Sequence, residues 1–301
     1  MILGLVGPTA IGKSALALQL AKELNTNIIS ADSMQIFKEF NIGTAKPSNE
    51  EMSRIKHYMI NIVDPCDSFN SNNYSQQVDK IITLENDKGQ IPFMVGGTGF
   101  YFDSTLYEMD FENSVDYDLR KELNNYLILN GALELHNLLM KYDIESAMKI
   151  HPNNTKKVIR AIEIYKTTGL KKSDGNLNNK KLKYENIIFE LTINREVLYK
   201  NIEKRVDKMI DNGLFDEVFN LMKYVPIDAQ SMQGIGYKES VNYLKGNCTK
   251  EQTITSIKQN TRNYAKRQIT YFKRLNTIKL DADLSANENI NIINSIIKRY
   301  I

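Results

Sequence analysis

Short apolar runs alternate with amphipathic segments along the first hundred residues of the chain. Residues 1–6, 27–31 and 91–95 are apolar runs of strand length, and residues 15–24 and 74–88 have the composition and spacing of helices. This alternation predicts an α/β fold built on a parallel sheet. Because parallel sheets collect ligands at the carboxyl ends of their strands, the residues after each strand are candidates for chemistry.

Helical patterns replace this alternation in the middle of the chain. Residues 116–168 read as helical, and the last helix of this region is expected to end before Gly169. The polar stretch 173–183 is expected to be a mobile loop, and residues 184–191 are expected to return to the sheet as a strand. We therefore predict a helical insertion domain at residues 113–183 within a core formed by residues 1–112 and 184–301.

Two further helices are predicted in the C-terminal part of the chain. Residues 195–211 carry apolar residues at helical spacing, and Gly213 follows them as a stop signal. Thr249 and Gln252 form a possible capping box at the start of a long helix that runs to Phe272.

Composition narrows the class of protein. The 301 residues have a net charge of +3, and no apolar run approaches the roughly 18 residues of a membrane-spanning helix. Since the first residues already read as a core strand, we expect no leader peptide and a cytoplasmic location. Cys66 and Cys248 lie far apart without C-x-x-C spacing, which indicates neither a disulfide framework nor a zinc site.

The positive charge is concentrated near the end of the chain. Residues 249–274 contain seven Lys and Arg residues but a single acid, Glu251, which leaves the remainder of the chain at −3. Lys258, Arg262 and Lys266 are four residues apart, so they share one face of the predicted helix. Interleaved aromatic residues make this helix suitable for a nucleic acid, although a solvated helix with core aromatics fits the same pattern.

Residues 7–14, GPTAIGKS, fit the phosphate-loop pattern G-x-x-x-x-G-K-[ST] and lie between a predicted strand and a predicted helix. In that context the backbone N–H groups and the positive end of the helix attract an anion. Lys13 would reach the terminal phosphates, and the Ser14 hydroxyl would complete the shell of a Mg²⁺ ion. A structural glycine turn is the alternative, because a pattern this short also arises by chance.

Two further residues follow predicted strands. Asp32 in ISADSMQ is either a cap for the next turn or a general base, and Thr98 in VGGTGFY is either a turn residue or a ligand contact. A phosphate-loop kinase would also need a carboxylate after an apolar strand, for which Asp64 after INIV is the candidate.

Six motifs occur in one order along nearly the whole chain. They are GPTAIGKS, ISADSMQIFKEFNIGTAKP, VGGTGFY, HPNNTKKVIRAIEIY, QSMQGIGYKE and AKRQITYFKR. Together they resemble the tRNA dimethylallyltransferase family in its bacterial form. The departures are small: Tyr271-Phe272 stands where the family often has a tryptophan, and no C-terminal Cys/His zinc module follows.

The resemblance implies a P-loop NTPase-like fold and transfer of the dimethylallyl group of dimethylallyl diphosphate to the exocyclic amine of adenosine 37 in tRNA. Asp32 is then the base that removes the amine proton, and Thr98 orients the amine. The donor diphosphate, with Mg²⁺ on Ser14, is expected on Gly7, Pro8, Thr9, Ala10, Ile11, Gly12, Lys13, Ser14 and Arg205. The target base must leave its stack to reach Asp32.

The resemblance also implies an anticodon stem-loop surface. Individual base contacts are not assigned among its members. The expected residues are Asp32, Ser33, Met34, Gln35, Thr98, Arg120, Lys156, Lys157, Arg160, Gln233, Gly234, Gly236, Tyr237, Lys238, Arg262, Lys266, Arg267, Gln268, Tyr271 and Lys273.

Three other functions fit parts of the sequence. An adenylate isopentenyltransferase would run the same chemistry on a free nucleotide without needing the basic helix or the insertion. A small-molecule kinase would hold ATP in the phosphate loop, and a non-catalytic RNA-binding module would need no base at Asp32. We expect a monomeric enzyme that acts on tRNA.

Overall fold

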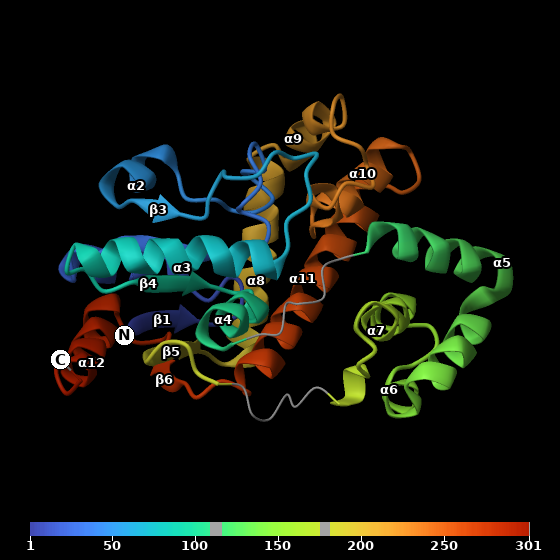
Figure 1. The fold of residues 1–301 in the computed structure, drawn as a ribbon. Coiled ribbons are helices and arrows are strands. Elements are labelled where there is room, and N and C mark those ends of the chain that lie inside the picture. Colours follow the sequence, from blue (N-terminus) through green and yellow to red (C-terminus); the bar gives the residue numbers. More distant parts are fainter. Residues whose placement is uncertain (109–115, 175–180, 301) are drawn as a thin grey trace. The chain divides into compact units, whose positions relative to one another are not determined.

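The computed structural model describes residues 1–108, 116–174 and 181–300 of the chain (Figure 1). The chain divides into two compact units, residues 1–106 with 183–301 and residues 107–182. The domain boundary predicted between residues 112 and 113 lies outside the described residues. The same is true of residues 175–180 in the expected loop.

The first unit is built on a sheet in the strand order β3-β2-β4-β1-β5-β6. Every neighbouring pair in it is parallel. The strands are β1 (Ile2–Val6), β2 (Ile28–Ala31), β3 (His57–Tyr58), β4 (Phe93–Gly96), β5 (Asn186–Thr192) and β6 (Ile278–Asp281). With a phosphate loop directly after β1, this confirms the predicted P-loop NTPase-like α/β fold.

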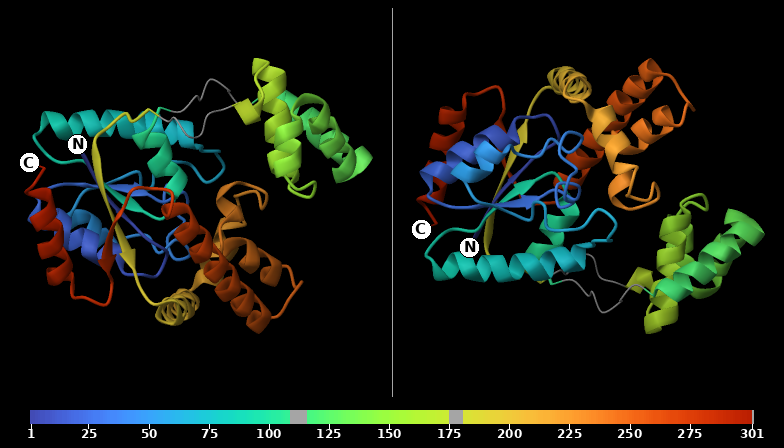
Figure 2. Two further views of the ribbon diagram at one scale, coloured as in Figure 1. Left: turned by 90° about the horizontal axis from the view of Figure 1, so that it is seen from below. Right: turned by 90° about the horizontal axis from the view of Figure 1, so that it is seen from above.

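Helices cover both faces of this sheet. Figure 2 shows α3 (Ser71–Asp87) on one side and α1 (Lys13–Glu23) with α12 (Ala286–Ile297) on the other. Strand β1 is buried along its whole length, as a strand covered on both faces must be, and this explains its continuous apolar run. Helix α4 (Gly99–Leu106) packs beside α3.

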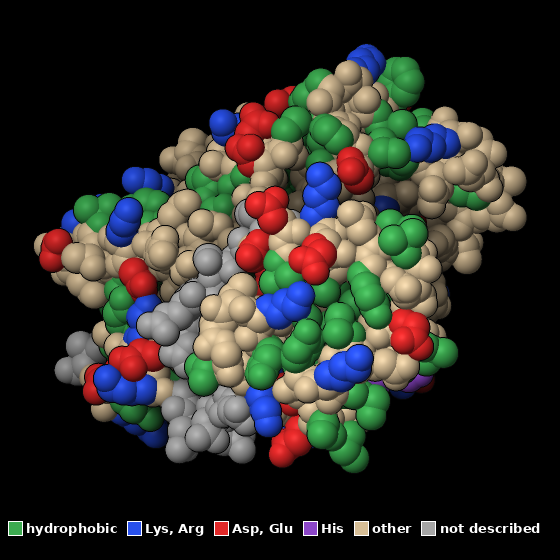
Figure 3. Space-filling model, turned by 45° about the vertical axis from the view of Figure 1, so that its right-hand side comes forward, with side chains coloured by type: hydrophobic (Ala, Val, Ile, Leu, Met, Phe, Trp, Pro, Cys, Tyr) green, Lys and Arg blue, Asp and Glu red, His purple; other side chains and the backbone are tan. Residues whose placement is uncertain are grey.

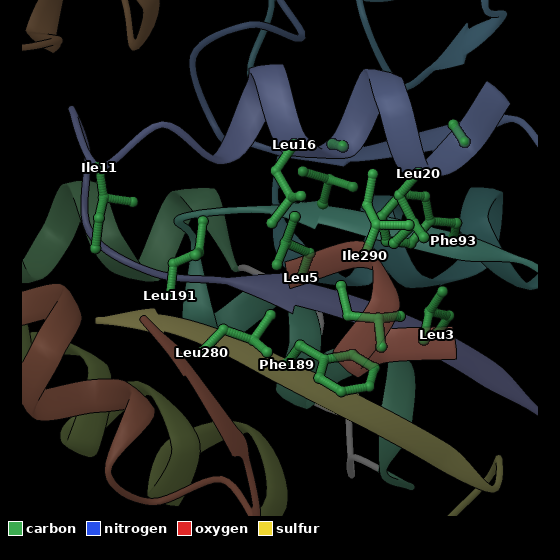
Figure 4. Close-up of a cluster of buried hydrophobic side chains, with 14 of the residues drawn as sticks. Leu3, Leu5, Ile11, Leu16, Leu20, Phe93, Phe189, Leu191, Leu280 and Ile290 are labelled. Carbon is green, nitrogen blue, oxygen red and sulfur yellow. The ribbon is translucent and has the colours of Figure 1, made fainter. Parts of the chain in front are cut away.

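The main core lies between the sheet and helices α1 and α12. Figure 4 shows Leu3 and Leu5 of β1 together with Leu16 and Leu20 of α1 and Ile290 of α12. All five side chains are at most 4% exposed. This packing fixes the start of α1, and therefore the phosphate loop, against the end of β1.

The C-terminal helices follow the predicted pattern closely. Helix α8 (Arg195–Asp211) has the predicted bounds, and α11 (Lys250–Phe272) begins with the predicted capping box. Between them lie α9 (Leu214–Leu221), the 3₁₀ turn η2 (Ser231–Gln233) and α10 (Tyr237–Leu244). Helices α8 and α11 pack together.

The second unit is helical, with its own small core. Its helices are α5 (Tyr117–Tyr142), α6 (Ile144–Lys149) and α7 (Thr155–Thr168), followed by the turn η1 (Lys172–Asp174). Gly169 ends α7 in the left-handed conformation, as predicted. Leu135, Leu139 and Ile162 are fully buried in this core. Figure 3 shows hydrophobic side chains among the charged ones on the surface turned towards the reader.

The segment between β2 and α3, which the structure describes in full, lacks the strand that a kinase would need before Asp64. Residues 60–63 form no strand beyond a single bridge between Phe37 and Val63. The described chain instead turns through α2 (Asn49–Arg54) and the two-residue strand β3. No helix within the described residues is long and apolar enough to cross a membrane.

Candidate functional site

The phosphate loop curls back on itself between β1 and α1. Gly12 adopts a left-handed conformation with φ of 100° at the start of α1, and Ala10 also has a positive φ of 65°. Lys13 Nζ donates to the Pro8 carbonyl oxygen at 2.7 Å, which holds the side chain over the loop. Ser14 is exposed in the first turn of α1. The N–H groups of this helix end are therefore open to an anion.

A pocket of about 310 Å³ lies over the loop. Asp32 reaches it from the end of β2, Gly97 from the end of β4, and Arg205 from the middle of α8. Lys13 and Ser14 line the same pocket. The sheet thus brings together the predicted phosphate loop, cation and base, although up to 198 positions separate them in the chain.

The electrostatic state of this pocket favours an anion. Burial, together with the nearby positive charge of Arg205, lowers the pKa of Lys13 to about 7, while Asp32 acts in the opposite direction. Burial also lowers the pKa of Arg205. Two partly desolvated cations side by side repel each other, and an anion between them removes that cost.

Asp32 uses one carboxylate oxygen to hold the turn that follows β2. Oδ1 accepts hydrogen bonds from the N–H groups of Met34 at 2.8 Å and Gln35 at 3.3 Å. Within the described residues, Oδ2 accepts no hydrogen bond. The two roles considered for Asp32, cap and base, are therefore compatible, since each can use a different oxygen.

Thr98 lies against the same turn. Its Oγ1 accepts a hydrogen bond from Ser33 N–H at 3.1 Å, and its side chain also interacts with the phenol of Tyr264. Burial raises the pKa of Tyr264 to about 12, and the charge of Asp32 adds to this shift. Tyr264 lines the pocket as a neutral phenol, a contact that the sequence did not single out.

Gln268 has a role that sequence reasoning missed. Its Oε1 accepts from Thr9 N–H at 2.9 Å, and its Nε2 donates to the Gly97 carbonyl at 2.9 Å. The side chain is only 5% exposed, so it lies inside the protein rather than on the expected RNA surface. The Thr9 N–H, expected to face the diphosphate, is therefore already engaged. No local sequence signal identifies a partner 259 residues away.

The glycines around Thr98 permit close approach by α11. A Cβ on Gly97 would lie 2.1 Å from Gln268 Nε2, and a Cβ on Gly99 would lie 2.1 Å from Tyr271 Cδ1. Tyr271 is held there because its hydroxyl donates to Asp103 Oδ2 at 2.7 Å. The glycine-rich turn therefore serves packing as well as any ligand contact.

The basic helix α11 carries two kinds of cation. Lys258 and Arg262 form ion pairs with Asp207 at 2.6 Å and Glu203 at 2.7 Å on α8. The other three basic residues of the expected RNA surface here are exposed: Lys266, Arg267 and Lys273. The first pair ties α11 to α8, and the second group stays open to solvent.

The QSMQGIGYKE segment supports the turn after Asp32. Tyr237 is 1% exposed, and its hydroxyl donates to Glu217 at 2.7 Å. A Cβ on Gly234 would lie 2.6 Å from Met34, so this glycine packs against the turn. Gly236 begins α10, while Gln233 and Lys238 line a separate surface pocket.

In the helical unit, Arg120 and Arg160 share one carboxylate. Both donate to Glu163, a fully buried residue, at distances of 2.7 to 3.0 Å. Burial alone would raise the pKa of Glu163, but these hydrogen bonds lower it. Lys156 and Lys157 are exposed on the same helix, α7.

Asp64 does not belong to the pocket over the phosphate loop. It is exposed, and its Oδ1 accepts from Cys66 N–H in a turn. A kinase would need this carboxylate near the metal and the phosphates. Within the described residues, no group of three His, Cys, Asp or Glu side chains could hold a metal by itself.

The sequence of the chain matches the IPP transferase family over residues 35–275. The chain belongs to this family. Among curated members, the tRNA dimethylallyltransferase of Clostridioides difficile (strain 630) is 46% identical over 300 residues, which cover 99% of this chain and 96% of that protein. That of Lachnoclostridium phytofermentans is 42% identical, covering 98% of this chain and 95% of the relative.

Solved structures of IPP transferases share the fold. The tRNA delta(2)-isopentenylpyrophosphate transferase of Staphylococcus epidermidis superposes with a TM-score of 0.75 at 39% identity, covering 100% of this chain and 99% of that one. A eukaryotic dimethylallyltransferase, described as acting on tRNA, gives 0.84 at 29% identity over 99% of this chain and 79% of that one. The resemblance inferred from the six motifs is confirmed.

Proposed function

We propose that the chain transfers the dimethylallyl group from dimethylallyl diphosphate to the exocyclic amine of adenosine 37 in tRNA and releases diphosphate. The observation that carries this proposal is one pocket lined by the phosphate loop, Arg205 and Asp32. The phosphate loop and Arg205 can bind the leaving diphosphate, and Asp32 can accept the amine proton. The names of the relatives, tRNA dimethylallyltransferases, support the same reaction.

The donor side stabilises the leaving group. As the allylic C–O bond breaks, negative charge builds on the diphosphate, and Lys13 and Arg205 line the place where it develops. The loop N–H groups from Ala10 to Ser14 add fixed dipoles, whereas Thr9 N–H is held by Gln268. This preorganised field needs little rearrangement during the reaction.

The residues around the phosphate loop fit a Mg²⁺ ion that arrives bound to the diphosphate. The Ser14 hydroxyl is exposed beside the loop, and Mg²⁺ in such sites takes most of its ligands from phosphate oxygens and water. Ser14 would hold the ion. When bound, it would neutralise charge on the diphosphate.

The acceptor side removes a proton. The adenine amine attacks the allylic carbon, a C–N bond forms as the C–O bond breaks, and the amine proton passes to Asp32 Oδ2. Thr98 lies beside this carboxylate and would orient the amine. Because a stacked adenine cannot place its amine beside Asp32 in the pocket, adenosine must be flipped out of the anticodon loop to enter it.

The exposed basic residues favour tRNA over a free nucleotide. Lys266 and Arg267 on α11, Lys273 after it, and Lys156 and Lys157 on α7 are free to contact phosphates. A free-nucleotide enzyme has no need of them. We further propose that the protein is cytoplasmic and acts as a monomer.

The test is a reaction with defined components. The full chain is incubated with Mg²⁺, dimethylallyl diphosphate and an unmodified anticodon stem-loop, and the nucleosides are examined by mass spectrometry. We expect prenylated adenosine from the stem-loop and none from AMP. Prenylation of AMP alone would favour the free-nucleotide enzyme, and a product that depends on ATP would favour a kinase.

A further inference from the structure

A second pocket adjoins the first on the side of the diphosphate. It has a volume of about 830 Å³ and lies between α8 and residues 41–52. Ala10, Lys46 and Arg205 line both pockets, whereas Asp32 lines only the first. The second pocket therefore adjoins the first beside the phosphate loop and Arg205, apart from the acceptor site at Asp32.

The lining of this second pocket is cationic. Lys46, Lys204, Arg205 and Lys208 contribute to it, and none of the described lining residues is an acid. The neighbouring acids of α8, Glu203 and Asp207, are paired with α11 instead. Within the described residues Lys204 and Lys208 form no ion pair, and they lie one helical turn apart on the same face.

The wall between the two pockets is held firmly. Lys46 Nζ donates to the Phe37 carbonyl at 2.7 Å and to Asn61 Oδ1 at 2.6 Å. Burial lowers the pKa of Lys46 to about 8, an effect that Glu217 and Asp32 oppose. Arg205 donates to the Thr44 carbonyl at 3.4 Å. Two fixed cations thus stand where the pockets meet.

The outer wall of the second pocket is also held in place by hydrogen bonds. The Glu217 carboxylate on α9 accepts hydrogen bonds from the N–H groups of Asn41, Ile42 and Gly43 at 2.8 to 3.3 Å. Because a carboxylate that accepts several backbone N–H groups fixes them strongly, residues 41–43 keep their place in the pocket lining.

We propose that this second pocket is an anion subsite that receives the diphosphate leaving the phosphate loop. The identity of the anion rests on the proposed function. Four cations, with no acid among the described residues that line the pocket, suit a compact, highly charged ligand. None of the described lining residues is aromatic, so the pocket lacks the stacking surface that a nucleotide base would use.

The test measures binding of inorganic diphosphate to a chain whose first site is filled. The full chain is saturated with Mg²⁺ and the unreactive analogue dimethylallyl S-thiolodiphosphate, and inorganic diphosphate is then titrated by calorimetry. We expect one further equivalent to bind, more weakly as salt rises. Absence of this binding would overturn the subsite, whereas failure of the analogue to bind would contradict the proposed function.

Variants of α8 show where the additional equivalent of inorganic diphosphate binds. The double variant Lys204→Ala/Lys208→Ala should weaken it by about tenfold or more, with the affinity for the analogue nearly unchanged. Lys200→Ala, an exposed lysine of α8 outside the pocket lining, is the matched control and should have no effect. Equal binding by the double variant and the control would place the diphosphate elsewhere and reject the proposal.

Discussion

The two carboxylate oxygens of Asp32 have different surroundings. One can therefore hold the local structure while the other takes part in the reaction. Oδ1 accepts two backbone hydrogen bonds that shape the turn after β2. Oδ2 is the oxygen available to a substrate proton. A substitution that keeps the first function and removes the second can therefore be chosen.

Asp32→Asn is that substitution. Its amide oxygen can still accept from Met34 and Gln35, but an amide cannot take the amine proton. We expect the single-turnover rate to fall by about two to four orders of magnitude, with nearly unchanged affinity for donor and tRNA. Asp32→Ala should lose as much rate and also melt at a lower temperature. An Asp32→Asn enzyme that retains most of its rate would remove Asp32 from the chemistry.

At the scale of elements, α11 joins the two halves of the site. Its inner face carries Gln268, which holds both the phosphate loop and the turn before Thr98. Its outer face carries Lys266 and Arg267, which are exposed. One helix thus serves the donor loop on one side and an RNA surface on the other.

Gln268→Ala should loosen the phosphate loop. It leaves the buried Gly97 carbonyl and the half-buried Thr9 N–H without their partner, and a buried unpaired group costs about 1 to 3 kcal/mol. We expect lower thermal stability and weaker binding of the donor analogue, measured by calorimetry. Gln259→Ala, an exposed glutamine of the same helix, should change neither by a measurable amount. Unchanged donor binding in Gln268→Ala would contradict this role.

The lysines of α11 should differ in how much they contribute to tRNA binding. Lys266→Ala should weaken tRNA binding and flatten its salt dependence, since one phosphate contact disappears. Lys258→Ala should change tRNA binding less, because Lys258 is paired with Asp207. Binding is measured at several salt concentrations. Equal losses in both variants would show that the ion pair does not withhold Lys258 from RNA.

The contrast between these lysines shows what the sequence could predict. The bounds of α11 follow from a local capping box and helical spacing, and the phosphate loop follows from a contiguous pattern. The partner of Lys258 lies 51 residues away on α8, and that of Gln268 lies 259 residues away. Such pairings arise from tertiary packing, so spacing within one segment gives no sign of them. The apolar run before Asp64, which a kinase would need as a strand, forms only a single bridge between Phe37 and Val63 within the described residues.

At the scale of the whole molecule, the helical unit is stabilised by a buried carboxylate of its own. Asp143 is fully buried, and its carboxylate accepts hydrogen bonds from Ser146 N–H, Ser173 N–H and Ser173 Oγ at 2.7 to 3.0 Å. Burial by itself would raise the pKa of Asp143, but these hydrogen bonds lower it to about 2. The ionised form therefore links the start of α6 to the turn η1.

The sign of the pH effect follows from this lowered pKa. An aspartate with a pKa of about 3.9 in the unfolded chain and a lower value when folded stabilises the fold above pH 4 by about 2 to 3 kcal/mol. That contribution is lost as the pH falls towards 2. Asp143→Asn should therefore weaken the amide-exchange protection of α6 and α7 at pH 7, and the difference from the natural chain should shrink between pH 4 and 2.

Glu145→Gln is the matched control for this prediction. Glu145 lies in the same helix as the residues that Asp143 caps, but its ion pair with Lys149 is more than 70% exposed on both sides. Exposed pairs contribute little, so this variant should keep nearly full protection at every pH. If Asp143→Asn lost the same protection at pH 2.5 as at pH 7, packing of the side chain rather than its charge would hold α6 to η1.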